Sequence, residues 1–448
     1  MHKLCLCRQK GIQMELFNLL AGEAQIAIFG QTFDVSLGLI GPLIRGLILG
    51  VGSVGVGIIL FSLILKAIVL PFDVYQRISM RKQNKKMEEN KERMEKLQKQ
   101  YANDKEAYSR KVMEMYKESG ISVLSSCLPM ILSMVIFFVA LGGFNAYSQY
   151  ANVENYNIMV NAYNTKIQTM MTELGSDVCI FDETNKQYTV IIEKAAEKDA
   201  GIQAAIDAAL TANTENKTQA EVEKEAVEAY FTSAAQDAVL EAYNTDVKKN
   251  VSFLWIKNIW ETDASYKHPV LSYTDFKAQI EREDFVVGDN DKATLTDAMN
   301  ATVNSPYDSF AYEIITGKLT EAKSQSNGFY ILIVLSIGTI LLQQFVSMRS
   351  QKAQQQYSSV DGQGASQQKT MMVTMTAMFA IFAFMYSASF SIYMITSNIL
   401  SLLSMLIINK IVDIALEKKA AKDFQAKYNK RFPAYMQKET GKKSKKQK

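Results

Sequence analysis

Lys66 is the residue whose position most directly suggests chemistry, because it is charged and lies inside the apolar run from Phe61 to Leu70. A charge inside a membrane costs a few kcal/mol even on lenient scales, so it needs water or a partner. If the helix ends near Pro71, Lys66 lies roughly 7 Å from that end, and its long side chain could reach the surface. Ser62 shares its helical face one turn earlier and favours a polar cavity instead.

Further polar side chains lie inside other apolar stretches of the chain. Hydroxyl groups at such positions commonly join neighbouring helices. Together with amides and a lysine they can also line a water-filled groove, where the cation attracts acidic residues of a passing chain. Ser336, Thr339 and Gln343 share one helical face by their spacing. The candidate groove residues are Lys66, Ser62, Ser133, Gln343, Thr374, Ser397 and Asn398.

Residue patterns typical of catalysis do not occur in the sequence. The chain has two histidines, His2 and His268, and four scattered cysteines, so we expect neither a metal site nor a disulfide framework. It contains no phosphate-binding loop and no nucleophile elbow. We therefore expect no catalytic residues, no ATP hydrolysis, no metal and no cofactor.

Five mostly apolar stretches of about 17 or more residues could each cross a ~30 Å hydrocarbon layer. They run from Val51 to Leu70, Leu124 to Phe144, Phe329 to Val346, Met371 to Tyr386 and Ile392 to Ile408. The predicted fold class is an all-α integral membrane protein with a five-helix transmembrane core, a cytoplasmic helical hairpin and a large, mainly helical extracellular insertion. The domain boundaries are an N-terminal tail with an interfacial helix (1–50), transmembrane helix 1 (51–71), the hairpin (72–122), helix 2 (123–146), the insertion (147–327), helix 3 (328–348), a cytoplasmic loop (349–369), helix 4 (370–388), helix 5 (390–408) and a basic tail (409–448).

The distribution of charge predicts how the spans are oriented. The segment from Phe72 to Ser122 has 13 Lys and Arg against 9 Asp and Glu, and the tail from Asn409 has 13 against 4. Basic short segments remain in the cytoplasm. The segment from Tyr147 to Asn327 has 15 basic against 29 acidic residues, which fits an outside domain. Five spans then place the N-terminus outside and the C-terminus in the cytoplasm.

The segments next to the spans have recognisable helical patterns. Ser36 to Gly50 reads as an interfacial helix followed by a Gly-rich bend, and the alternative is one longer, tilted first span. No cleavable signal is evident.

After Pro71 we expect a long helix, a turn from Tyr101 to Asp104 with Asp104 as N-cap, and a second helix. In the insertion, Tyr188 to Ile192 suggests a strand and Glu193 to Leu240 two or three helices.

Several motifs resemble those of the YidC/Oxa membrane insertases. Phe61 to Pro71 resembles the first core span of that family, in which an arginine normally occupies the position of Lys66. Phe253 to Ile259 resembles the family's outer Phe-Leu-Trp motif, and Tyr393 to Asn398 the signature of its last span. Further matches are Gln98 to Glu106, Met115 to Gly120, and Cys127 to Pro129. The matched segments cover about 240 residues in the family's order and topology.

Other positions depart from the family pattern. Lys66 keeps the charge but loses the planar fork of arginine, so bidentate pairing is lost. Ser133 and Val135 replace Gln and Pro, and Ser387, Ser389 and Met394 replace Pro, Gly and Trp. These changes affect the shape of the groove and the substrate range rather than the fold. The insertion follows the second span, which points to the Gram-positive type.

The resemblance implies a membrane protein insertase and chaperone of the bacterial plasma membrane, not an enzyme. Nascent membrane proteins would enter a hydrophilic groove that carries a positive charge, without ATP. The implied partners are nascent chains, membrane lipids, the ribosome and the Sec translocon, and not DNA. One alternative is a small-solute transporter or channel with an external ligand-capturing domain, which predicts paired intramembrane charges or an inverted repeat. Another is a receptor with an external sensor domain.

Overall fold

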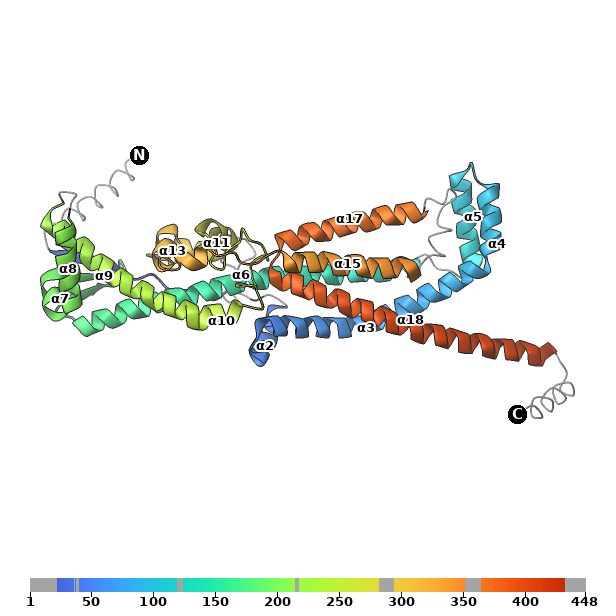
Figure 1. Cartoon of the computed structure of the whole chain (residues 1–448), viewed down its shortest axis with the longest axis horizontal. Helices are drawn as coiled ribbons and strands as arrows, with labels where there is room; N and C mark the ends of the chain where they lie inside the picture. Colours follow the sequence, from blue (N-terminus) through green and yellow to red (C-terminus); the bar gives the residue numbers. More distant parts are fainter. Residues whose placement is uncertain are drawn as a thin grey trace. The chain divides into compact units, whose positions relative to one another are not determined.

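The computed structural model describes residues 22–35, 37, 40–118, 124–213, 217–281, 294–350 and 364–431. It is mostly helical (Figure 1). The chain divides into two compact units, which are described separately. Unit 1 comprises Met1–Ile58, Leu141–Ile331 and Phe384–Phe390, and unit 2 comprises Ile59–Ala140, Leu332–Ala383 and Ser391–Lys448.

Long helices build unit 2, and some continue into unit 1. Three described segments are long and apolar enough to cross a membrane: Val54–Ser79, Ile331–Arg349 and Ala388–Ala426. The helices of this part of the chain are α3 (Val54–Glu89), α4 (Lys91–Gln100), α5 (Lys105–Glu118), α6 (Leu124–Leu174), α15 (Ile331–Ser350), α17 (Gly364–Met385) and α18 (Ala388–Arg431).

The sequence suggested that the first spanning helix ends at Pro71. In the structure α3 continues to Glu89 with Pro71 inside it. Proline removes one backbone hydrogen bond, the one to the carbonyl of Ala67, and the flanking residues keep the helix. The stretch of α3 from Val54 to Ser79 contains a segment long and apolar enough to cross a membrane. Lys66 lies twelve residues after Val54 in this stretch, roughly 18 Å along the helix at 1.5 Å per residue.

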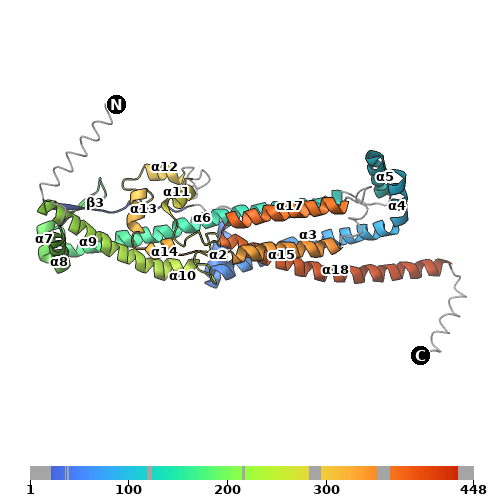
Figure 2. The same ribbon diagram turned by 45° about the horizontal axis from the view of Figure 1, so that its top comes forward.

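α4 and α5 lie side by side as a helical hairpin in Figures 1 and 2. Asp104 caps α5, since its carboxylate accepts a hydrogen bond from the Ala107 N–H at 2.9 Å. The predicted long first helix is interrupted near Asn90, where α3 gives way to α4. A small core closes the hairpin, and its buried members are Met94, Tyr108, Val112 and Met115.

Unit 1 contains a three-stranded antiparallel sheet in the order β1-β3-β2. β3 (Gln187–Ile191) confirms the predicted strand and pairs with β2 (Cys179–Asp182). β1 (Glu23–Ala27) comes from the segment expected to be an N-terminal tail, and Ile26 pairs with Tyr188. Part of the N-terminal segment therefore folds with the insertion.

Helices supply most of unit 1. Three of them, α7 (Ile192–Lys198), α8 (Ala200–Ala212) and α9 (Gln219–Ala242), match the predicted series. They are followed by η1 (Tyr243–Val247), α10 (Lys248–Val251), α11 (Tyr273–Ile280), α12 (Leu295–Asn300), α13 (Ser309–Ile315) and α14 (Thr320–Ser324). Four aromatic rings form a cluster in which Tyr156 and Phe276 each contact the other and both remaining rings, with centroids 4.7 to 6.5 Å apart. The remaining rings are those of Tyr307 and Tyr312.

α2 (Gly41–Val51) is a separate helix, as expected, and the alternative of one longer first span is wrong. It ends at Gly52, whose φ of 70° lies in the left-handed region that glycine adopts without strain. The first turn of α3 packs on the loop that begins at Phe253. A side chain at Gly55 would meet the Phe253 ring at 2.2 Å, so only glycine fits there.

Some predictions fall on residues that the structure does not describe. These predictions concern the first 21 residues, most of the expected cytoplasmic loop (351–363) and the end of the basic tail (432–448).

Candidate functional site

Lys66 is paired within unit 2. Its ammonium group donates to the carboxylate of Asp73 on the same helix and to the Ser401 Oγ of α18 at 2.8 Å. Asp73 follows Lys66 by seven residues, about two helical turns, so both side chains lie on one face. Each side chain is 13% exposed. Ser62, one turn earlier, is buried.

α18 connects this pair to a second spanning segment. Asn398 precedes Ser401 by three residues, and its amide donates to the Thr339 Oγ1 of α15 at 3.3 Å. Ser336, on the same face of α15, donates to the backbone carbonyl of Ser391 at 3.3 Å. The polar groups of three candidate spans therefore join along α18.

Other predicted groove residues are not brought into this cluster. Thr374 is exposed, and Gln343 makes no hydrogen bond to a described residue. The contact between α15 and α17 is instead made by their neighbours, since Thr376 donates to the Gln344 Oε1 at 3.0 Å. Ser397 is partly buried and bonds to Tyr393 on its own helix. The side chain of Ser133 lies outside the described set.

Sequence analysis missed three charged groups of this site because the first span was drawn to end at Pro71. They are Asp73, Arg77 and Arg81. The spacing in the sequence was the available signal. Asp73 follows Lys66 by seven residues, and Arg77 and Arg81 follow at intervals of four, which places all of them near one face of a helix. Arg81 forms an ion pair with Asp413 of α18 at 2.8 Å.

The cluster has the chemistry of charge recognition rather than of catalysis. Lysine, arginine and serine donors at a partly buried position can bind a carboxylate. The Ser401 hydroxyl can rotate and act as donor or acceptor, so it can adjust when Lys66 exchanges one carboxylate for another. Among the described residues, no group of three or more His, Cys, Asp or Glu side chains could hold a metal ion.

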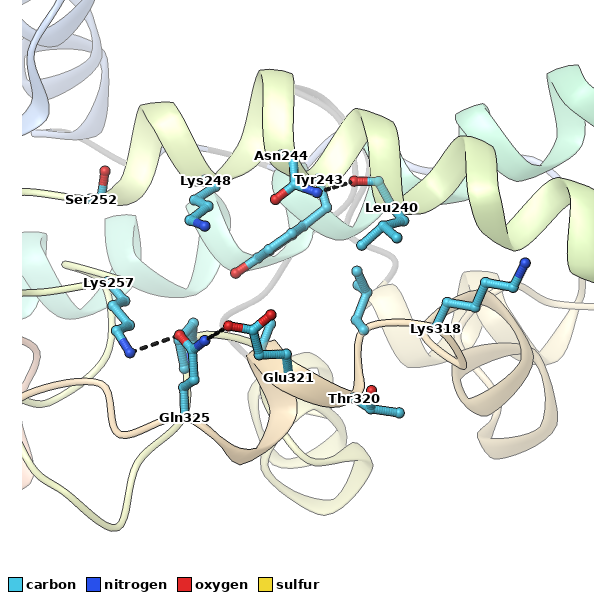
Figure 3. A pocket seen from close by; sticks show the side chains of 13 residues that line it. Leu240, Tyr243, Asn244, Lys248, Ser252, Lys257, Lys318, Thr320, Glu321 and Gln325 are labelled. Carbon is cyan, nitrogen blue, oxygen red and sulfur yellow. Dashed lines mark hydrogen bonds between the residues drawn. The ribbon is translucent and has the colours of Figure 1, made fainter.

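Unit 1 contains a pocket of about 250 Å³ (Figure 3). Its polar lining includes Lys248, Lys257, Lys318 and Glu321. Lys257 donates to Gln325 at 2.7 Å, and Lys318 pairs with Asp237 at 2.6 Å. Of these three lysines, Lys248 alone has no polar partner within the described part of the chain. Since Glu321 balances it, the pocket has little free charge for a ligand.

Unit 1 also buries a carboxyl group beside Trp260. Glu261 is 7% exposed and accepts hydrogen bonds from Asn152 at 3.0 Å and Gln279 at 3.2 Å. Burial raises the pKa of Glu261 from 4.5 to about 7, and the nearby Lys267 and the two amide donors oppose that rise. The carboxyl is therefore half protonated near neutral pH.

Comparison with known proteins identifies the family. The family model described as 60Kd inner membrane protein matches residues 47–213 and 237–417, which is more than half of the chain. The chain belongs to the YidC/Oxa family. The resemblance seen in the sequence is thereby confirmed. With its apolar helices, this YidC/Oxa member is a membrane-integral protein.

Individual relatives match a shorter segment. The "Membrane protein insertase YidC" of Fusobacterium nucleatum is 36% identical over 92 residues, 20% of this chain and 43% of that relative. The proteins of the same name from Caldanaerobacter subterraneus and Clostridium perfringens are 35% identical over 88 residues and 34% over 101, covering 20% and 21% of this chain. The match spans 41% of each of these two relatives. No solved structure matches the chain.

Proposed function

We propose that this YidC/Oxa member inserts nascent membrane proteins and assists their folding. The observation that carries the proposal is Lys66, a cation within one candidate span that donates a hydrogen bond to Ser401 of another. Membership of the family supports the same function, since the relatives above are called membrane protein insertases. The five-helix core and the groove lined by the candidate residues belong to this proposal.

The physical basis is a lower cost of moving polar groups. A substrate's polar tail loses its hydration when it enters lipid, which costs several kcal/mol for each unpaired group. Polar side chains such as Ser401 and Asn398 replace part of that hydration. Lys66 then pairs with an acidic group of the tail. Burial of the substrate's apolar span drives release at roughly 25 cal/mol per Å², so the cycle needs no ATP.

Charge suggests the orientation and the partners. With the N-terminus outside, the insertion at 147–327 is extracellular, and the segment that forms α4 and α5 receives substrates in the cytoplasm. The lysine-rich end of the chain, from Lys442 to Lys448, suits the ribosome or anionic lipid. Action beside the Sec translocon is part of the same proposal.

Reconstitution tests this function. Purified protein in liposomes should insert a short-tailed, single-span substrate that empty liposomes do not insert. Lys66→Ala should reduce insertion of a substrate with an acidic tail about tenfold, the effect of losing about 1.4 kcal/mol. Lys66→Arg should keep it. Lys82→Ala, which removes an exposed charge from the same helix, is the matched control. Equal insertion by Lys66→Ala and wild type at equal expression would refute the role of Lys66.

One observation favours the transporter alternative. Lys66 and Asp73 are paired charges within a candidate span, which is a feature expected of transport pathways. Ion or solute flux in the same liposomes, without substrate insertion, would support a transporter instead.

A further inference from the structure

Lys66, the cation proposed to bind the substrate's carboxylate, already has a carboxylate partner within the protein. Asp73 accepts from Lys66, and both side chains are largely shielded from solvent. A carboxylate on a substrate tail must therefore compete with a carboxylate of the protein for the same ammonium group. In low dielectric such competition is strong, because an unpaired charge is costly.

The same face has one more cation than this pair uses. Arg77 follows Asp73 by four residues, about one helical turn. Its Nε is buried and has no hydrogen-bond acceptor among the described residues. Lys66 and Arg77 are thus two cations around a single carboxylate, and this group of three charges has a net charge of +1.

We propose that Asp73 occupies the place of a substrate carboxylate on Lys66 and is displaced when an acidic tail arrives. The inference rests on the proposed insertase function and adds a residue that sets its specificity. Asp73 acts through Lys66, so it is a positioning residue. Its presence means that only a tail with its own carboxylate is retained.

The exchange leaves no charge without a partner. When a substrate carboxylate binds Lys66, Asp73 can turn toward Arg77, one turn further along α3. The substrate carboxylate adds a fourth charge to Lys66, Asp73 and Arg77, and the net charge of this group falls from +1 to zero. A neutral tail cannot make this exchange, because it would leave the ammonium group of Lys66 without a carboxylate partner.

The test varies the charge of the tail and of Asp73 together. Wild-type protein in liposomes is compared with Asp73→Asn, using a single-span substrate whose tail has two Asp residues and the same substrate with two Asn. A photoreactive residue in the tail reports binding by crosslinking. Asp73→Asn should increase crosslinking of the Asp tail about tenfold at subsaturating substrate and leave the Asn tail unchanged. Asp413→Asn, which breaks the ion pair with Arg81, is the matched control and should show no dependence on the tail.

A role of Asp73 in structure alone predicts a different pattern. An equal change for both tails, or the same change in Asp413→Asn, would overturn the proposal. The gain must also vanish in the double variant Lys66→Ala, Asp73→Asn, and a gain that survives without Lys66 would refute it as well. Asp73→Ser provides the same test if Asp73→Asn does not fold.

Failure of the two proposals can be told apart. If wild type inserts neither substrate, the insertase function itself is wrong, and the role of Asp73 is wrong with it. If wild type inserts both substrates and Asp73→Asn changes them equally, only the role of Asp73 is wrong.

Discussion

Replacing Glu261 by Gln should stabilise unit 1 at alkaline pH and have little effect at acidic pH. The folded state raises the pKa of this carboxyl from 4.5 to about 7 because the group is buried. Between these two values the folded state holds a proton that the unfolded state has released. The free energy of unfolding therefore falls as the pH rises from 4.5 to about 7, and above this window it falls no further on account of Glu261.

The size of the effect follows from the two pKa values. Their difference, at about 1.4 kcal/mol per pH unit, corresponds to about 3 kcal/mol for the ionised group. Glutamine cannot ionise, and its amide oxygen can still accept from Asn152 and Gln279. Glu261→Gln should therefore raise the unfolding midpoint at pH 8 by roughly 6 to 12 °C, and by much less at pH 5.

Tryptophan fluorescence provides the assay. The chain has two tryptophans, and Trp260, next to Glu261, is buried against Tyr147 with ring centroids 4.9 Å apart. Thermal unfolding of the full chain in detergent is followed at both pH values. Glu183→Gln, at a side chain that is 80% exposed, is the matched control and should change neither midpoint. An equal shift of Glu261→Gln at pH 5 and pH 8 would contradict the reasoning.

Two further substitutions test the local structure. Asp104→Ala removes the cap of α5 and should cost the hairpin about 1 kcal/mol, seen as faster hydrogen exchange of the Ala107 amide, whereas Asp104→Ser should restore protection. Gly55→Val places a side chain on the Phe253 ring and should destabilise the loop by about 1 to 3 kcal/mol with a changed Trp255 emission. Gly46→Val, where a side chain meets no atom within 4 Å, is its control, and identical emission of the two variants would contradict this packing.

Local signals in the sequence were sufficient for several elements. Asp104 was recognisable as a cap because its side chain competes well for the free N–H groups of a helix start. The β-branched run around Tyr188 indicated a strand. The break between α2 and α3 followed from its glycines. Each of these features depends on residues that are close together in the chain.

Contacts between distant segments could not be predicted in the same way. The pairing of Ile26 with Tyr188 joins segments far apart in the sequence, although the alternation of polar and apolar residues from Glu23 to Ile26 was a weak signal. Thr376 and Gln344 meet, rather than Thr374 and Gln343, because the rotation of each helix depends on its packing. Asp73 was missed because Pro71 was treated as a helix end.

The two turns of α3 between Lys66 and Asp73 also constrain how this gene can change. A helix advances about 100° per residue, so seven residues return a side chain to within about 20° of the same direction. One residue inserted or deleted in that interval would rotate Asp73 away by about 100°, whereas exchanging one apolar residue for another would leave its direction unchanged. Homologues that keep the pair should therefore differ over this interval in composition but not in length, and their insertions and deletions should fall outside it.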